Sequence, residues 1–199
     1  MEKSDSLNLL PCDGEVLYFK HGFTSAEAAI HFESLLNSIE WKQDEIWMFG
    51  RTIVTKRKVA WYGSSPFSYT YSKTTKKALL FTRELLEIKQ VTELVTGESY
   101  NACLLNLYNA GEEGMGWHSD NENTIVADSA IASVSFGASR KFSFRHKQTK
   151  ETISLQLEGG SILLMRGQTQ SNWQHASLTS KRVRQPRINL TFRKMIVPI

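Results

Sequence analysis

The sequence predicts an α+β fold in which two amphipathic helices precede a β half built as a sandwich or barrel. Apolar residues recur at helical spacing in two early segments, 24–39 and 81–96. From residue 100 onward, short stretches of alternating apolar and polar residues follow one another at regular intervals. The chain has 199 residues, of which 41% are hydrophobic, so it can fill one core well but is short for two. We therefore expect a single domain.

Sequence signals mark where each expected helix starts or stops. In the first helix, Thr24 and Glu27 have the spacing of a capping box, and the apolar residues that follow keep to one face. In the second helix, Gly97 follows the periodic segment and supplies a stop. Ahead of both helices, residues 1–14 are polar and are broken by Pro11 and Gly14. We expect this segment to form a loosely ordered lead-in to a domain at 15–199.

The β half is expected to contain short strands separated by turn residues. Their predicted ranges are 100–108, 131–136, 141–146, 152–157, 161–165, 173–178 and 187–193. The last of these strands alternates most clearly, because successive side chains of a strand point to opposite faces. One face would carry Ile188, Leu190 and Phe192, and the other Arg187, Asn189, Thr191 and Arg193.

Two arginines, Arg187 and Arg193, therefore share one face of the last strand. Burying an unpaired charge costs several kcal/mol, so a cationic inner face is unfavourable unless an anion meets it. We expect a ligand with carboxylate or phosphate groups beside this strand.

His118 and Asp120 provide the first part of a metal site. The same period of two places their side chains on one face of an extended segment, where both could bind one ion. A later histidine, His175, could supply the third ligand. Two imidazoles and one carboxylate, with the remaining positions open, form the facial triad of non-haem Fe(II) oxygenases. The same groups also suit a hydrolytic Zn(II) site, but that reading leaves the two arginines without a role.

Longer motifs surround these residues. They are NLY at 106–108, IASVSFGA at 131–138, FRHK at 144–147 and NLTFRK at 189–194. With the His-x-Asp pair and the paired arginines, they resemble the AlkB family of Fe(II)- and 2-oxoglutarate-dependent dioxygenases, which dealkylate nucleic acids. The resemblance covers about residues 45–195 and is strongest to the branch that repairs double-stranded DNA.

This resemblance implies a more specific fold and activity. The fold would be a double-stranded β-helix, or jelly roll, at about 100–195, with the N-terminal helices supporting one sheet. A nucleotide-recognition lid would occupy about 45–75. The activity would be oxidative demethylation of 1-methyladenine and 3-methylcytosine in DNA. In that reaction O2 converts 2-oxoglutarate to succinate and CO2 and hydroxylates the methyl group, which then leaves as formaldehyde.

By the same resemblance, His118, Asp120 and His175 would hold Fe(II) and leave positions for 2-oxoglutarate and O2. Arg187 would bind the distal carboxylate of 2-oxoglutarate, because a guanidinium can form a two-pronged fork with a carboxylate. Arg193 would serve the end nearer the metal. One geometric difficulty remains, since the two arginines are separated by about 20 Å of extended strand, which is longer than the cosubstrate.

The remaining predicted contacts also follow from the resemblance. Asn106 and Tyr108 would hydrogen-bond 2-oxoglutarate from a shared strand face, and Asn189 would brace the same site. Glu122 follows Asp120 by two residues, and its carboxylate would favour cationic methylated bases. An ordinary loop acid remains the alternative for Glu122.

Three aromatic residues are expected to contact the damaged base or the gap that it leaves in the duplex. Tyr71 would stack on the damaged base against the imidazole of His118, with Tyr69 as a second contact. Phe49 would fill the gap that a flipped base leaves in duplex DNA, as an apolar wedge. For Tyr69 and Tyr71 the alternative is a half-buried strand position, and for Phe49 it is plain core packing.

The charge distribution favours a polyanionic partner. The net charge is only +4, from 24 Lys and Arg against 20 Asp and Glu, but basic residues gather in 51–58, 140–150 and 181–184. Each run alone would suit a solvated face, whereas three beside an oxygenase signature favour nucleic acid. Duplex DNA is preferred on the resemblance. Because phosphate contacts carry no base information, single-stranded DNA, RNA and tRNA stay open, as does binding without turnover.

Cysteine usage and hydropathy bear on the compartment. Cys12 and Cys103 are far apart in the sequence, which suits a reducing environment. No secretory leader is seen, and no apolar stretch approaches the roughly 18 residues that span a bilayer. We expect a cytoplasmic monomer without membrane contact, associated with the nucleoid if the source is bacterial. The nuclear targeting of the animal enzymes is not expected here.

Overall fold

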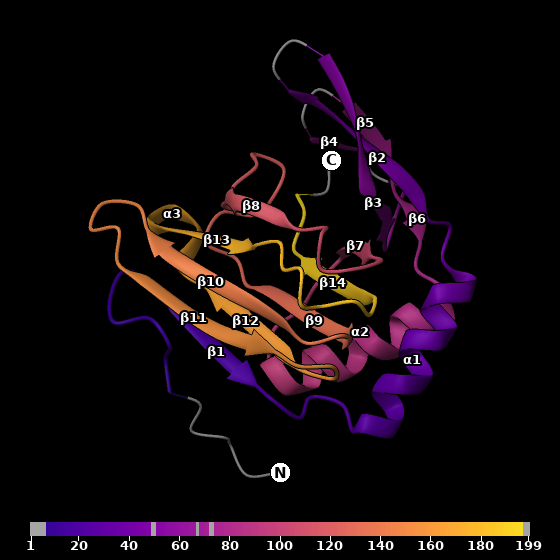
Figure 1. Ribbon diagram of the computed structural model, residues 1–199, viewed down its shortest axis with the longest axis horizontal. Helices are drawn as coiled ribbons and strands as arrows, with labels where there is room; N and C mark the ends of the chain where they lie inside the picture. The colour runs from indigo at the N-terminus through magenta and orange to yellow at the C-terminus, as the bar shows by residue number, and fades with distance from the viewer. Residues whose placement is uncertain (1–6, 49–50, 67, 72–73, 197–199) are drawn as a thin grey trace.

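The computed structural model describes residues 7–48, 51–66, 68–71 and 74–196, and the side chains among them apart from those of 44–48, 51–53, 68–71 and 74–76. Two β-sheets face each other, and two helices cover the outer face of the larger sheet (Figure 1). This is the jelly roll that the resemblance implied, and the expectation is confirmed. Among the described helices, none is long and apolar enough to span a membrane.

The larger sheet contains most of the strands and is antiparallel except for one short pair. Its order is β1 (Glu15–Phe19), β12 (Ile162–Arg166), β9 (Ile131–Gly137), β14 (Arg187–Arg193), β7 (Ala102–Tyr108), β3 (Arg51–Gly63) and β2 (Lys42–Met48), with β6 (Leu79–Leu80) parallel to β3. The smaller sheet has the order β11 (Thr152–Leu157), β10 (Arg140–His146), β13 (Trp173–Ser177) and β8 (Met115–His118).

Two long helices, α1 (Ser25–Ser38) and α2 (Arg83–Thr96), begin and end where local chemistry predicts. The Thr24 hydroxyl accepts from the backbone N–H of Glu27, and the Glu27 carboxylate accepts in return from the backbone N–H of Thr24, which completes the capping box. Gly97 ends α2 in the left-handed region, at φ 72°, where glycine has no steric penalty. Both predictions are confirmed.

The last strand, β14, separates the core from the site. Its apolar residues Ile188, Leu190 and Phe192 are fully buried in a cluster that includes Leu35 of α1 and Leu85 of α2. Its polar residues face the space between the two sheets, where they line a cavity. The predicted alternation is confirmed. Because a one-residue slip would reverse every side chain, burial of this face also fixes the register of the polar face.

The segment before β1 was expected to be loosely ordered, but residues 8–14 make specific contacts. Residues 8–14, here called the N-terminal strap, lie against the connection between β12 and β13, which contains the short helix α3 (Thr169–Asn172). Leu10 is only 3% exposed and packs in the core, and the indole Nε1 of Trp173 donates to the carbonyl of Cys12 at 3.1 Å. Polar composition was misleading, because the side-chain Oδ1 of Asn8 accepts from the backbone N–H groups of Leu10 and Val16 and so holds the turn.

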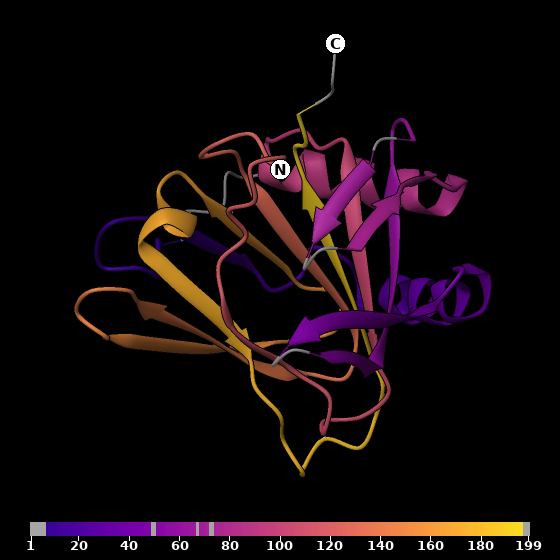
Figure 2. The same ribbon diagram turned by 90° about the horizontal axis from the view of Figure 1, so that it is seen from above.

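The expected order of helices before strands is also wrong in part. Strand β1 precedes α1, and β2 to β6 lie between the helices. Within 45–75, β2 and β3 form one hairpin and β4 (Ser68–Tyr71) pairs with β5 (Thr74–Lys77) in another. Figures 1 and 2 show these hairpins together at one side of the molecule, away from β10 and β11. Short edge strands such as β1 carry too few residues for a clear alternating pattern.

Candidate active site

The three predicted metal ligands lie together between the two sheets. His118 ends β8 and His175 lies in β13, and these two residues are direct partners in the register of that strand pair. Their imidazole centroids are 4.3 Å apart. Asp120 follows β8 and brings its Oδ1 to 3.7 Å from His118 Nε2. One ligand atom from each residue lies within 4.8 Å of the other two, so a single ion can contact all three.

Hydrogen bonds prepare His118 and Asp120 for a metal. The Nδ1 of His118 lies 2.8 Å from the carbonyl of Gly116, to which it must donate, so Nε2 keeps its lone pair. The Oδ2 of Asp120 accepts from Arg193 Nη2 at 2.6 Å and from Nε at 3.2 Å. The backbone N–H of Asp120 donates to Gln170 Oε1 at 2.9 Å. These contacts fix both ligands in orientations that suit a divalent cation.

Electrostatics keep the buried ligands deprotonated. For Asp120, burial raises the pKa, but the charges of Arg193, His175 and His118 and the hydrogen bond from Arg193 outweigh it and lower the pKa to about 2. For His175, burial and then the neighbouring His118 lower the pKa to about 3. Metal binding requires an ionised carboxylate and a neutral imidazole. Both forms are therefore present at neutral pH.

A polar cavity continues from these ligands along the inner faces of β7 and β14. It contains all five residues predicted to contact 2-oxoglutarate, since Arg187 pairs with Tyr108 and Asn189 with Asn106 in the register of the two strands. The lining includes Asn106, Tyr108, His118, Asp120, Ser133, His175, Arg187, Asn189, Thr191 and Arg193. We call it the cosubstrate cavity.

Arg187 has the properties of a carboxylate receptor. Its side chain is 2% exposed, and its Nη2 donates to Ser135 Oγ at 2.9 Å. Its Nε has no hydrogen-bond partner among the described residues. Burial lowers its pKa to about 10, so it stays charged at neutral pH. A buried guanidinium with an unused donor fits an anionic ligand, and a dicarboxylate satisfies it.

Arg193 lies near the metal ligands, where it was predicted, and its contact with 2-oxoglutarate stays a prediction. It lines the cosubstrate cavity, but its guanidinium is already paired with Asp120 in a buried ion pair. Arg187 and Arg193 stand at opposite ends of β14, where Arg187 contacts Ser135 and Arg193 contacts Asp120. The pairing joins residues 73 positions apart, which local sequence patterns do not encode. Asn189, expected as a brace, donates through Nδ2 to Ser133 Oγ at 2.8 Å and to the Val134 carbonyl at 3.0 Å.

Comparison with known proteins gives the same result as this geometry. The sequence pattern of the 2OG-Fe(II) oxygenase superfamily matches residues 15–193. The chain is 36% identical over 198 residues to the DNA oxidative demethylase ALKBH2 of Bos taurus, covering 94% of this chain and 69% of that protein. The chain belongs to the AlkB family of 2OG-Fe(II) oxygenases.

Further relatives agree with this family. The alpha-ketoglutarate-dependent dioxygenase alkB homolog 3 of Bos taurus is 38% identical over 177 residues, covering 84% of this chain and 61% of the relative. The solved structure of OsALKBH1 shares the fold, with a TM-score of 0.59 at 14% identity, over 90% of this chain and 97% of that one. The protein is an Fe(II)- and 2-oxoglutarate-dependent dioxygenase, and its cofactors are Fe(II), 2-oxoglutarate and O2.

A larger cavity of about 410 Å³ adjoins the metal ligands of this AlkB-family dioxygenase. One wall is residues 55–57 of β3, and the other is residues 112–118. His118 and Met115 line both this cavity and the cosubstrate cavity. Its volume falls in the range of about 300–1,000 Å³ that is usual for small-molecule sites. We call it the substrate cavity.

The wall at 112–118 depends on close backbone packing. The N–H of Gly111 donates to the carbonyl of Val183 at 2.8 Å, and the N–H of Ser180 donates to the carbonyl of Gly111 at 2.7 Å. A Cβ at Gly111 would lie 2.1 Å from the Ser180 oxygen, whereas a Cβ at Gly116 meets nothing within 4 Å. Glycine at 111 is therefore required by this close approach.

Replacing Gly111 with alanine is expected to lower the free energy of unfolding by about 1–3 kcal/mol, the usual cost of overpacking. The same change at Gly116, in the same wall, is the matched control and should have a much smaller effect. Urea unfolding followed by circular dichroism measures both. Equal losses in the two variants would mean that the contact with residues 180–183 does not limit stability.

Of the four residues predicted to contact the base, the structure describes the side chain of Glu122 alone. Glu122 lines neither of these two cavities but a third, of about 610 Å³, whose wall includes Asp120. Tyr69 and Tyr71 lie in β4, paired with Lys76 and Thr74, and their side chains are outside the described set. Phe49 lies outside the described residues. The roles of all four residues therefore stay predictions.

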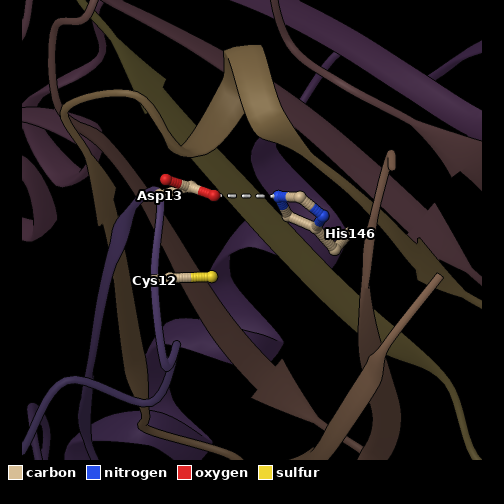
Figure 3. A group of neighbouring side chains, drawn as sticks. All are labelled: Cys12, Asp13 and His146. Carbon is tan, nitrogen blue, oxygen red and sulfur yellow. Dashed lines mark ion pairs between the residues drawn. The ribbon is translucent and has the colours of Figure 1, made fainter. Parts of the chain in front are cut away.

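A second group of ligand-type side chains does not suit a metal. Cys12, Asp13 and His146 lie within 4.8 Å of one another, with His146 Nε2 3.3 Å from Asp13 Oδ2 (Figure 3). The Nδ1 of His146, however, accepts the backbone N–H of Thr149 at 3.1 Å. The ring proton must then sit on Nε2, which lies near the carboxylate and has no lone pair for an ion. In His118 the proton is on Nδ1 and the lone pair on Nε2, which is the opposite tautomer. The group joins the N-terminal strap to the β10–β11 hairpin.

Proposed function

We propose that this dioxygenase demethylates 1-methyladenine and 3-methylcytosine in DNA by oxidation and releases formaldehyde and succinate. The observation that carries the proposal is the position of His118, which lines both the cosubstrate cavity and the substrate cavity. A methyl group in the substrate cavity would thus lie beside the metal. The relatives named DNA oxidative demethylase support DNA as the nucleic acid.

The residues of the chain position the reactants. When bound, Fe(II) and 2-oxoglutarate would supply the oxidation of an N-methyl group by O2, in which 2-oxoglutarate loses CO2 and takes one oxygen atom to become succinate, and the other oxygen atom leaves with the methyl carbon as formaldehyde. His118, Asp120 and His175 would hold the ion on one side, so that the other side stays open. Arg187 would anchor the cosubstrate by its distal carboxylate and fix its orientation. Asn106 and Tyr108 would hold it from the neighbouring strand.

Basic side chains at the mouth of the substrate cavity support a nucleic-acid partner. Lys56 and Arg57 belong to the β3 wall, and Lys56 is exposed. On the opposite wall, the ring centroid of Trp117 lies 4.4 Å from the guanidinium carbon of Arg145, which lies behind it and donates to Gln174 Oε1 at 3.0 Å. An exposed lysine and an aromatic ring on facing walls suit a phosphate backbone with unstacked bases.

Selection of cationic methylated bases would fall to Glu122. It lies near the metal ligand Asp120 in the third cavity, so its charge acts at short range on a base that reaches the iron. Replacing Glu122 with glutamine is expected to lower kcat/KM for 3-methylcytosine by about tenfold, since one partly buried charge contact is worth about 1.4 kcal/mol. Turnover of a neutral methylated base in parallel serves as the control. An equal loss on both substrates would reject charge selection.

We propose duplex DNA as the preferred form, with Phe49 as the wedge. Phe49→Ala is expected to reduce demethylation of duplex DNA by about tenfold or more, because filling the gap offsets an unstacking cost of a few kcal/mol. Single-stranded DNA needs no such wedge and serves as the internal control. Initial rates of formaldehyde release on matched oligonucleotides measure the ratio. An equal loss on both forms would assign Phe49 to packing.

The first test is reconstitution with Fe(II) and 2-oxoglutarate under anaerobic conditions, followed by air. Formaldehyde and the mass loss of 1-methyladenine are scored in duplex DNA, single-stranded DNA and RNA. Duplex DNA is expected to react fastest, whereas a higher rate on RNA would favour RNA demethylation instead. Succinate without any demethylation would mean an oxygenase with another substrate. Because one chain supplies every residue named above, we expect monomers to be active, which light scattering on the reacting sample checks.

A further inference from the structure

We propose that Arg140 is a positioning residue that couples the cosubstrate cavity to the wall of the substrate cavity. Arg140 touches neither the predicted metal nor the predicted 2-oxoglutarate contacts other than Tyr108. Its role rests on where its guanidinium lies, between the residues that receive the cosubstrate and the loop that shapes the substrate cavity. The assignment of that second cavity to substrate comes from the proposed function.

Arg140 holds the wall from inside. It is 1% exposed, although it is a charged residue at the first position of β10. Its Nη2 donates to the carbonyls of Glu113 at 2.8 Å, Leu178 at 3.2 Å and Gly111 at 3.4 Å, and its Nη1 donates to Ala110 at 3.4 Å. One side chain thus joins the 109–114 loop to residue 178. The loop leads directly into β8, which carries His118.

Arg140 is also close to the cosubstrate residues. Its guanidinium carbon lies 5.7 Å from the ring centroid of Tyr108, and that of Arg187 lies at the same distance from the same ring. Tyr108, Arg187 and Arg140 lie close together because each stands at the end of a strand, and these ends are neighbours in the fold. Tyr108 ends β7, Arg187 begins β14 opposite it, and Arg187 also pairs with Gly137, which ends β9 just before Arg140.

Two buried cations therefore share one aromatic ring. The hydrogen bonds of Arg140 within the described part of the chain all go to main-chain carbonyls, and its Nε has no partner there. The charge of Arg140 acts against that of Arg187. A carboxylate bound at Arg187 would relieve this repulsion and stabilise both guanidinium groups. Cosubstrate binding would in this way tighten the loop that Arg140 holds.

The proposal predicts a specific response to 2-oxoglutarate. In the wild-type protein with Fe(II) under anaerobic conditions, 2-oxoglutarate is expected to slow amide hydrogen exchange across 109–117. In Arg140→Lys and Arg140→Met this slowing should be lost. Lysine keeps the charge but cannot reach several carbonyls as a planar fork, so it should not restore the response. Arg166→Met is the control, because Arg166 pairs with Glu15 and Glu98 outside the site.

Turnover gives a second readout that a general loss of stability would not change. With an oligonucleotide containing 3-methylcytosine, the KM for the oligonucleotide is expected to rise about tenfold in Arg140→Lys, as for the loss of a charged hydrogen bond, with a smaller change in kcat. The ratio of formaldehyde to succinate should also fall, because a loose wall lets cosubstrate oxidation proceed without a positioned base. Arg166→Met should keep the wild-type ratio.

Two results would overturn the proposal. One is a normal exchange response of residues 109–117 to 2-oxoglutarate in both Arg140 variants. The other is a proportional fall of formaldehyde and succinate with unchanged KM, which would mark Arg140 as structural only. Failure of the DNA proposal would look different, since no demethylation would occur in the wild-type protein, while the exchange experiment contains no nucleic acid and would still test Arg140.

Discussion

Replacing Asp120 with asparagine is expected to reduce succinate formation by more than about 100-fold, since removing even an outer partner of a metal ligand costs about 10–100-fold. The amide cannot supply the negative charge that binds Fe(II), although its oxygen can still accept from Arg193. The measurement pairs the succinate assay with iron content per chain after gel filtration. Both values should fall together.

The control for this variant is Asp128→Asn. Asp128 is an exposed acid with a φ of 55°, a conformation that asparagine tolerates well. It should retain iron and turnover. If Asp120→Asn bound iron normally and still turned over, the metal would not be held by this carboxylate. Asp120→Ala adds a stability test, because it leaves the buried Arg193 without its ion pair and should cost about 3–5 kcal/mol in the iron-free protein.

The second large effect is expected for Arg187→Met. The KM for 2-oxoglutarate should rise by about 30-fold or more, as for the loss of a buried charge pair worth about 2–5 kcal/mol. The same substitution should not lower the stability of the ligand-free protein. Burial already lowers the pKa of Arg187, so its charge is costly in the absence of a ligand, and methionine removes that cost. Thermal unfolding without 2-oxoglutarate should therefore occur at an equal or higher temperature.

Arg187→Lys separates charge from shape. The ammonium keeps the charge but cannot form the two-pronged fork, so its KM should lie between those of the wild type and Arg187→Met. Initial succinate rates at varied 2-oxoglutarate give all three values. A wild-type KM in Arg187→Met would place the cosubstrate elsewhere. A large fall in unfolding temperature for the same variant would instead make Arg187 a stabilising residue of the empty protein.

Features that depend on residues within a single helix or strand could be predicted from the sequence. The Thr24–Glu27 capping box and the Gly97 stop are each set by residues a few positions apart. The alternation of β14 follows from strand geometry, and it predicted which of its residues line the cosubstrate cavity. His175 was expected as the third ligand, but its direct strand pairing with His118 was not predicted, because strand register depends on the whole sheet.

Contacts between residues far apart in the sequence could not be predicted from local patterns. The ion pair of Arg193 with Asp120 was not predicted, and nothing near either residue in the sequence indicates it. The same limit applies to Arg140, whose place in a basic run favoured contact with nucleic acid although its side chain is buried. Asn8 and Leu10 looked like parts of a loose segment, since the core and the backbone groups that they contact lie elsewhere in the fold.

The N-terminal strap has a consequence for how this enzyme is prepared. The family pattern begins at residue 15, so a fragment cut at that point would look complete. It would nevertheless lose the Cys12 and Asp13 carbonyls that hold Trp173 and Asn172, just ahead of His175. It would also lose Gly14, which fits against Thr169 beside Gln170, the partner of the Asp120 backbone. Iron retention during purification should thus depend on a segment that contributes no ligand.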